Sequence, residues 1–308
     1  MKRGLVIKST GNRSRVIDSS GNITECVIKG KFRMKGIRTT NPVAVGDYVK
    51  FEEEKVQGSA IITEIEKRRN YIIRKSSKLS KESQIIAANI DQLIILATIK
   101  MPETHTEFID RVLASAEAYR IPALVVFNKT DIYSDDERKK MEELVALYNE
   151  IGYRSFGVSL INENEKSDLA TIVQGKVTLL TGNSGVGKST LINLLNPSLE
   201  ARVEKLSDYH MSGKHTTTFS EMYAVNNSTY IIDTPGIKGF GMIDMDKEEI
   251  YHFFPEIFRV SKACRYHNCL HLDEPGCEVK NCVVNGDIEW SRYNSYLSIL
   301  EDNNSKYR

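Results

Sequence analysis

The feature that most constrains this 308-residue chain is a glycine-rich segment between an apolar run and a helical pattern. The segment consists of Gly182, Asn183, Ser184, Gly185, Val186, Gly187, Lys188, Ser189 and Thr190. It follows an apolar strand predicted at 177–180, and a helix is predicted from Lys188. Glycines let backbone N–H groups wrap phosphates, while Lys188 reaches the outer phosphate oxygens and Ser189 can ligate Mg²⁺. The segment therefore predicts a phosphate-binding loop in an α/β fold.

The sequence around this loop alternates apolar strands with helical patterns. Such alternation is typical of a largely parallel sheet with helices on both faces. The predicted strands are 90–98, 123–128, 155–159, 176–181, 220–225 and 229–233, and the predicted helices are 106–119, 135–151 and 188–196. Ligands of such sheets bind beyond the carboxyl ends of the strands. The loops that follow the strands are thus the places to look for chemistry.

A second motif selects the base of the nucleotide. The motif starts at the last residue of strand 123–128 and consists of Asn128, Lys129, Thr130 and Asp131. Asp131 would accept two hydrogen bonds that guanine offers and adenine does not, which favours GTP over ATP. Lys129 would lie along the base, and Asn128 would tie this loop to the phosphate loop. Ser159, at the end of strand 155–159, is predicted as a second base contact.

Two further stretches are predicted to contact Mg²⁺ and the third phosphate. After strand 229–233, Asp233 can hold Mg²⁺ through water, and the N–H of Gly236 can contact the third phosphate. The stretch 214–218 lies where the first switch loop of a GTPase belongs, and one of its three threonines should complete the Mg²⁺ shell. The pattern does not choose among the three, and Thr217 is our candidate.

Ile237 follows this motif at a position where many GTPases have a Gln that orients the attacking water. Isoleucine cannot orient water, so we expect slow intrinsic hydrolysis that a partner accelerates.

The stretch 237–241 contains two glycines and leads into the C-terminal tail. It predicts a hinge through which the nucleotide state moves the tail.

The first 75 residues differ in charge and in texture from the rest. They contain 17 Lys and Arg against 8 Asp and Glu, a net charge of +9, whereas residues 76–308 contain 25 against 33, a net charge of −8. Short strands are predicted at 5–8, 15–18, 24–29, 47–51 and 60–65. Five short strands and a basic surface predict an OB-like barrel that binds nucleic acid, with an SH3-like barrel as the alternative.

Four of the five cysteines lie in the last 45 residues. No secretory signal is apparent, so we expect a reducing compartment in which such a cluster binds metal. A closed tetrahedral zinc site would stabilise a tail that is predicted to be too small for a core of its own. The candidate ligands are Cys264, His267, Cys269, His271, Cys277 and Cys282. From spacing alone, Cys282 could replace His271.

The order of the motifs is permuted. A conventional GTPase has its phosphate loop first and its guanine motif last, but here Asn128–Asp131 and Ser159 precede Gly182. With its basic barrel and its Cys/His tail, the whole chain resembles the ribosome small subunit-dependent GTPase family. The resemblance implies zinc ligands Cys264, Cys269, His271 and Cys277, and a role for His215 in hydrolysis.

The resemblance also implies a late assembly factor of the small (30S) ribosomal subunit. The barrel and tail would bind ribosomal RNA, the subunit would stimulate GTP hydrolysis, and hydrolysis would release the protein from the subunit. Other assembly factors are expected as further partners. Basic residues cluster between Lys29 and Arg38, and we take this loop as the rRNA contact. A cytoplasmic monomer without a membrane segment is expected, since 41% hydrophobic and 27% charged residues are ordinary for soluble proteins.

The predicted fold is therefore multidomain. Residues 1–75 form an OB-like β-barrel, residues 76–243 a circularly permuted α/β P-loop GTPase domain, and residues 244–308 an α-helical zinc-binding domain. Bound GTP or GDP, Mg²⁺ and one structural Zn²⁺ are expected. The alternatives are a small-molecule kinase, a non-catalytic RNA-binding zinc protein and a translational GTPase, the last being disfavoured by length, by motif order and by Ile237.

Overall fold

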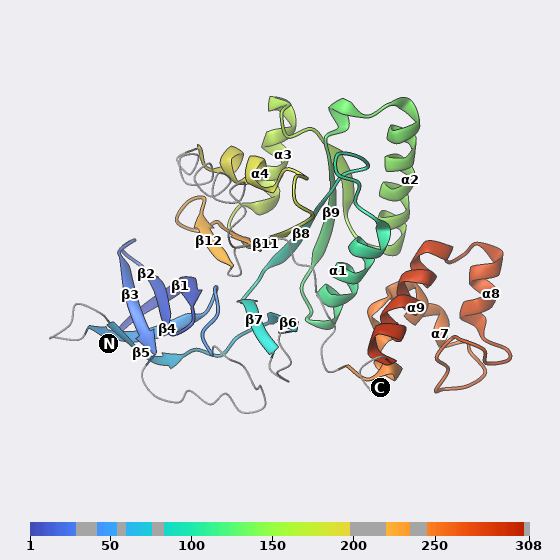
Figure 1. The fold of residues 1–308 in the computed structure, drawn as a ribbon, viewed down its shortest axis with the longest axis horizontal. Helices are drawn as coiled ribbons and strands as arrows, with labels where there is room; N and C mark the ends of the chain where they lie inside the picture. Colours follow the sequence, from blue (N-terminus) through green and yellow to red (C-terminus); the bar gives the residue numbers. More distant parts are fainter. Residues whose placement is uncertain (29–41, 54–59, 76–82, 198–219, 235–244, 305–308) are drawn as a thin grey trace.

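A barrel, a central sheet with helices and a helical tail follow one another along the chain (Figure 1). The computed structural model describes residues 1–28, 42–53, 60–75, 83–197, 220–234 and 245–304. In Figure 1 the barrel lies on the left in blue, and the tail lies on the right in red. The central sheet and its helices separate the two.

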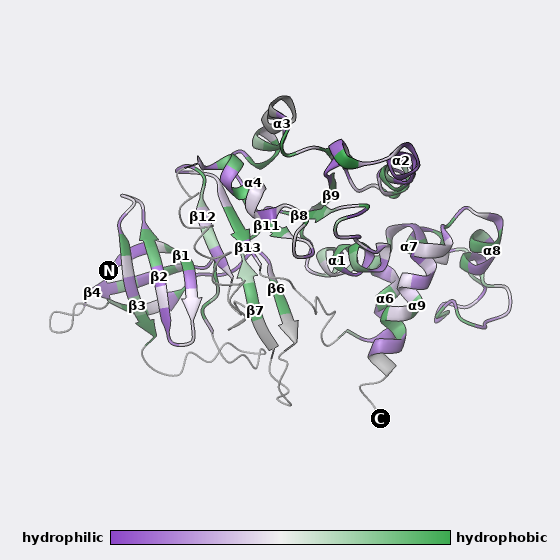
Figure 2. Cartoon of the chain, turned by 45° about the horizontal axis from the view of Figure 1, so that its top comes forward, coloured by the Kyte–Doolittle hydropathy of each residue, from purple (hydrophilic) through white to green (hydrophobic). Residues whose placement is uncertain are grey.

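The barrel is built from five short strands in which buried and exposed positions alternate, so that one face of each strand enters a common core. Figure 2 shows both hydrophobic and hydrophilic residues along these strands. The strands are β1 (Lys2–Thr10), β2 (Arg13–Asp18), β3 (Ile23–Ile28), β4 (Tyr48–Glu53) and β5 (Ala60–Ile65). The barrel core contains Val6, Val16, Val49, Phe51 and Ile62, which are fully buried. All five strand predictions are confirmed.

The pairing of the strands shows that the barrel is closed. The order is β1-β2-β3-β5-β4, and β4 pairs back with β1. The pairs are antiparallel except β3 with β5, which is parallel. A closed five-stranded barrel with this crossover is the OB arrangement, in agreement with the sequence prediction, and not an SH3-like meander.

A hairpin that the sequence analysis did not predict follows the barrel. It consists of β6 (Tyr71–Lys75) and β7 (Ser83–Ala88), which pair antiparallel as a separate two-stranded sheet. Val45, before β4, bridges to Ala87 of this hairpin. The predicted boundary between residues 75 and 76 therefore falls between two paired strands.

The central sheet has the order β10-β9-β8-β11-β13-β12. Its strands are β8 (Gln92–Ala97), β9 (Ala123–Asn128), β10 (Ser155–Val158), β11 (Val177–Thr181), β12 (Glu221–Ala224) and β13 (Tyr230–Asp233). All neighbouring pairs are parallel except β12 with β13. Every residue of β8 is buried, as expected of a strand covered on both faces. The predicted strands are confirmed, with ends that shift by one or two residues.

Helices lie over the faces of this sheet (Figure 1). They are α1 (Thr106–Ala118), α2 (Asp135–Ile151), α3 (Glu163–Val173) and α4 (Lys188–Leu195), with a 3₁₀ turn η1 (Thr130–Ile132). The α2 N-terminus is fixed by a capping box between Ser134 and Glu137. Helix α3 was not predicted; the other three were. No helix in the described part of the chain is long and apolar enough to cross a membrane.

The barrel and the central sheet share hydrogen bonds. Lys8 of β1 pairs with Glu221 of β12, which makes the two sheets one continuous eleven-stranded sheet. The Lys8 Nζ and Glu221 Oε2 atoms are 3.0 Å apart, and both side chains are about one-third exposed. The barrel is thus attached at the strand next to β13.

The tail is a small helical unit. Its elements are α6 (Lys247–Ile250), η3 (Tyr251–Phe253), α7 (Pro255–Ser261), α8 (Glu278–Asn285) and α9 (Trp290–Asn304). The tail was predicted to be too small for a core of its own, and the structure shows a buried cluster that it shares with α1. Ile250, Phe254, Ile257, Tyr296 and Ile299 are buried together with Cys269 and Cys277, and Ala114 of α1 closes the cluster.

A buried charge network fastens the tail to α1. Arg292 of α9 is 1% exposed and donates to Asp110 of α1 at 2.8 Å and to Glu256 of α7 at 2.7 Å. Asp110 also accepts from Ser295 of α9 at 2.6 Å and from Tyr148 of α2 at 2.9 Å. Since each of these groups would be costly to bury alone, the network fixes where the tail sits.

Replacing Arg292 should show how much this network contributes. Arg292→Met keeps most of the side-chain volume but leaves two buried carboxylates without a cation. We expect a loss of about 3–5 kcal/mol in the free energy of unfolding, measured by urea titration. Lys140→Met is the control because it breaks a half-exposed pair with Glu103 and should change nothing measurable. Equal unfolding midpoints for both variants would contradict this account.

Candidate functional site

The glycines of segment 182–190 adopt backbone conformations that other residues rarely adopt. Gly182, Gly185 and Gly187 have φ values of +151°, +84° and +108°. A Cβ on Gly182 would lie 2.3 Å from the carbonyl oxygen of Leu96. One on Gly187 would lie 2.4 Å from the side-chain nitrogen of Asn128. Two of the three glycines are therefore required by close packing as well as by φ.

Lys188 begins α4 and folds back over this loop. Its Nζ donates to the carbonyls of Gly182 at 2.8 Å and Asn183 at 2.9 Å. Burial lowers the pKa of Lys188, and the nearby carboxylate of Asp233 opposes this effect. Ser189 and Thr190, in the first turn of α4, are exposed. The loop thus presents a cation and hydroxyl groups at a helix N-terminus, the arrangement suited to a phosphate chain.

Asn128 connects three loops at one edge of the sheet. Its side-chain nitrogen donates to the Val186 carbonyl of the phosphate loop at 2.8 Å. Its side-chain oxygen accepts from the backbone N–H of Leu160 at 3.1 Å. Asn128 itself is 3% exposed, so both bonds are shielded from water. The guanine motif, the phosphate loop and the Ser159 loop are thereby held together.

The predicted base-contacting side chains also meet. Ser159 Oγ donates to Asp131 Oδ1 at 2.6 Å, and this pairing follows from the parallel register of β9 with β10. Thr130 and Asp131 lie in η1, and the Asp131 side chain is exposed. A fixed and exposed carboxylate can receive two adjacent N–H donors from a ring edge.

Asp233 lies at the same edge. It ends β13, and its register partner on β11 is Leu180, just before the phosphate loop. Thr234 donates its hydroxyl proton to the Leu180 carbonyl at 3.0 Å. Gly236, His215, Thr217 and Ile237 lie outside the described residues, as does the Lys29–Arg38 loop.

The loop between β8 and α1 was not predicted to be part of the site. Lys129 Nζ donates to the carbonyl of Met101 in this loop, and Pro102 Cδ is 3.5 Å from the position of a Cβ on Gly185. This loop therefore bonds to the base loop and lies next to the phosphate loop. A contact through a backbone carbonyl leaves no trace in residue identity, so no sequence signal could have found it.

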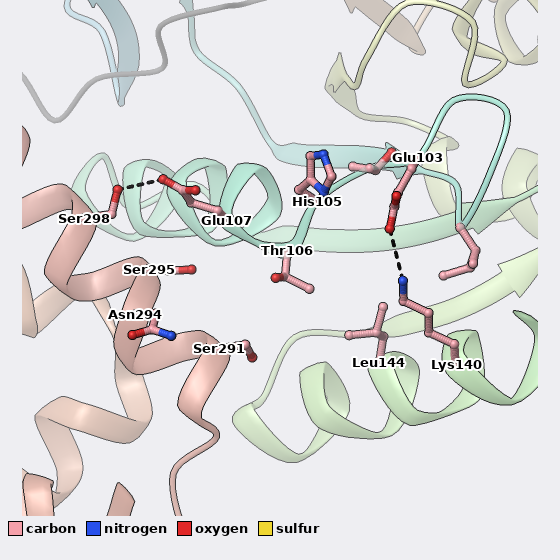
Figure 3. A pocket seen from close by; sticks show the side chains of 12 residues that line it. Glu103, His105, Thr106, Glu107, Lys140, Leu144, Ser291, Asn294, Ser295 and Ser298 are labelled. Atoms are coloured by element: carbon pink, nitrogen blue, oxygen red, sulfur yellow. Dashed lines mark hydrogen bonds and ion pairs between the residues drawn. The ribbon is translucent and has the colours of Figure 1, made fainter.

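A cleft of about 490 Å³ lies elsewhere, between α1, α2 and α9 (Figure 3). Figure 3 shows Ser291, Asn294, Ser295 and Ser298 on one wall, facing Thr106 and Leu144. Glu103 and Lys140 close it with an ion pair of 3.0 Å. This cleft lies where α9 of the tail meets α1 and α2, and the loops at Asn128 and Gly182 do not line it.

The tail brings together the four predicted metal ligands. The ligand atoms of Cys264, Cys269, His271 and Cys277 all lie within 4.8 Å of one another. Cys282 is also described and is not part of this group. His271 Nδ1 is 3.6 Å from the Cys264 sulfur and 3.5 Å from the Cys277 sulfur. A tetrahedral zinc ion would place sulfur and nitrogen ligands about 3.5 Å apart, so the cluster fits this ion.

The surroundings of His271 hold it in place. Its backbone is left-handed, with φ of +58°, and its carbonyl accepts from the hydroxyl of Tyr293 at 2.5 Å. Tyr296 donates to the carbonyl of Leu270 at 2.7 Å. Burial lowers the pKa of His271 and raises that of the Cys269 thiol to about 12. A lowered pKa favours the neutral imidazole, the form that donates a lone pair to a metal, whereas a raised thiol pKa means that a metal must displace the thiol proton.

Sequence profiles account for most of the chain. The profile described as RsgA GTPase matches residues 65–243, and that described as RsgA N-terminal domain matches residues 3–62. The chain belongs to the RsgA GTPase family. It is therefore a GTP-hydrolysing enzyme, as the guanine and phosphate motifs predicted. The family membership predicted from the motif order is confirmed.

Full-length relatives and solved structures agree with this family. A relative from Bacteroides fragilis, named small ribosomal subunit biogenesis GTPase RsgA, is 54% identical over 99% of both chains. One from Christiangramia forsetii with the same name is 48% identical over 99% of this chain and 98% of its own. YjeQ from Thermotoga maritima superposes with a TM-score of 0.75 at 32% identity, covering 98% of each chain.

A second solved structure supports the permuted order. YloQ, described as a circularly permuted GTPase, gives a TM-score of 0.72 at 26% identity and covers 99% of this chain and 96% of its own. In the present chain, β8, β9 and β10 precede the phosphate-loop strand β11 although all four belong to one sheet. The predicted permutation of the GTPase domain is confirmed.

The metal cluster can be tested by its stoichiometry. We predict one zinc ion per chain in the purified protein, measured by atomic absorption. Cys264→Ser should lose the ion, because three ligands hold zinc far more weakly than four. Cys282→Ser is the matched control and should keep it. Loss of zinc from the Cys282 variant alone would show that the cluster is assigned to the wrong cysteine.

Proposed function

We propose that this GTPase is a late assembly factor of the small (30S) ribosomal subunit, which it binds through ribosomal RNA and leaves after GTP hydrolysis. The observation that carries the GTP-dependent part of the proposal is the bond from Asn128 to Val186, which joins a guanine motif to a phosphate loop. The full-length relatives named for small ribosomal subunit biogenesis support the choice of partner. The protein would act in the cytoplasm as a monomer, and other assembly factors would be further partners.

In this proposal each edge loop has a separate task. The segment Gly182–Thr190 cradles the phosphates of GTP or GDP, with Lys188 on the outer phosphate and Ser189 on Mg²⁺. Asp131 reads guanine, supported by Ser159, while Lys129 covers the base. Asp233 and Thr217 complete the Mg²⁺ shell, and Gly236 contacts the third phosphate. The position of Asp233 beside the phosphate loop supports its part in this scheme.

The barrel and the tail would supply the contacts to ribosomal RNA. The OB arrangement of the barrel supports this, because such barrels bind nucleic acid on their open strand face. The basic residues between Lys29 and Arg38 would add charges that neutralise phosphates. A structural zinc ion on Cys264, Cys269, His271 and Cys277 would keep the tail folded.

The kinase alternative has less support. A kinase would not need a guanine-reading motif, whereas the base loop carries a carboxylate suited to guanine, held by Ser159.

Hydrolysis assays test the proposal directly. We expect slow GTP turnover by the purified protein, because Ile237 cannot orient water, and strong stimulation by small ribosomal subunits. Large subunits and ATP are the controls, and neither should support the accelerated reaction. Stimulation by both subunits alike, or by neither, would overturn the ribosomal assignment and leave the guanine site standing.

His215 is the proposed catalytic residue, which would orient water or stabilise charge in place of the missing Gln. His215→Ala should lower the turnover stimulated by the small subunit by at least tenfold, because this group would act only in the transition state. GTP affinity, measured by calorimetry, should stay the same. Unchanged turnover in the presence of subunits would remove His215 from the mechanism.

A further inference from the structure

The guanine loop contains a residue in an unfavourable backbone conformation. Lys129 is left-handed, with φ of +70° and ψ of +34°. A non-glycine residue adopts this conformation at a cost, and it persists where the surroundings over-determine it. The turn directs Thr130 and Asp131 away from β9 and into η1. Whatever holds this turn therefore also aims the Asp131 carboxylate.

Tyr133 provides such a hold. It follows η1 and is 7% exposed, with its ring in the main core of the central domain. Its hydroxyl oxygen accepts from the backbone N–H of Ile99 at 2.9 Å and donates its proton to the carbonyl of Asn128. One buried hydroxyl thus joins the end of β8 to the end of β9, at the peptide that precedes Lys129.

The other contacts of the turn do not replace this one. The side chain of Asn128 is directed to the phosphate loop and the Ser159 loop, and Lys129 Nζ reaches Met101. Farther along the turn, the N–H of Ile132 donates to the carbonyl of Lys129 at 3.1 Å and Arg138 donates to the carbonyl of Thr130 at 3.2 Å. Tyr133 instead fixes the carbonyl of Asn128, from which the left-handed turn starts. Its two partners are buried backbone groups that would lose a hydrogen bond if the hydroxyl were removed.

We propose that Tyr133 is a positioning residue for base selection, which acts through the backbone of Asn128 and Lys129 on the direction of Asp131. This inference rests on the proposed reading of guanine by Asp131. Guanine presents a ring N–H and a 2-amino group side by side, and a carboxylate can bind both only in one orientation. Hypoxanthine lacks the 2-amino group. A loosened loop would lose the second hydrogen bond, and with it the preference for guanine over hypoxanthine.

The test compares GDP with IDP on the full-length chain. For Tyr133→Phe we expect GDP affinity to fall about tenfold and IDP affinity at most threefold, measured by calorimetry, so that the GDP/IDP ratio falls. The matched control is Tyr153→Phe, a buried tyrosine in the same core beyond the end of α2, which should leave the ratio unchanged. Thermal unfolding of both variants reports any general loss of stability.

The outcomes separate this inference from the proposal beneath it. If Tyr133→Phe lowers the affinities for GDP and IDP by the same factor, or lowers only the unfolding temperature, Tyr133 is structural and the inference is wrong. If the unaltered protein binds IDP as tightly as GDP, guanine reading by Asp131 is itself wrong, and the role of Tyr133 is excluded with it. A reduced ratio in Tyr133→Phe alone supports the inference.

Discussion

The hydrogen bond from Asn128 to the carbonyl of Val186 joins two loops that are 58 residues apart in sequence. It is possible because β9 and β11 lie on either side of β8 in one parallel sheet, so that their carboxyl ends open on the same edge. This edge does not depend on the order in which the strands occur along the chain. A permuted chain can therefore build the same nucleotide site as a conventional one, provided that the strand order in the sheet is kept.

The permutation determines what is attached to each end of this domain. The barrel precedes it and is bonded to β12, the strand between the predicted switch stretch 214–218 and β13. The tail follows it and is fastened by Arg292 to Asp110 of α1. A hinge at 237–241 that moved the tail freely would have to break this buried network. Motion of the tail is therefore tied to α1, whereas the barrel is tied to the β12 edge.

Much of this fold follows from the sequence because its signals are local. The apolar run of β8 is only six residues long, and the capping box at the start of α2 involves residues three positions apart. Helix α3 was missed because the charged residues at its start hide the short apolar spacing of Leu169, Ile172 and Val173. The pair Arg292 and Asp110, separated by 182 positions, has no local pattern at all. The buried cluster of the tail likewise includes Ala114 of α1, a contact that has no local signal in the sequence of the tail.

The candidate site also contains some residues that the sequence predicts and others that it does not. Asp131 and Lys188 belong to short motifs and could be predicted from the sequence, whereas the spacing of the cysteines left Cys282 as an alternative ligand that the cluster in the structure does not include. Supporting groups act on backbone atoms, as Tyr133 does on Asn128, and backbone atoms are the same in every residue. A tyrosine two positions after Asp131 looks like any core residue. Selectivity for a base thus depends on positions that the motif does not include. Chains that share the motif can therefore differ in how rigidly the base loop is held.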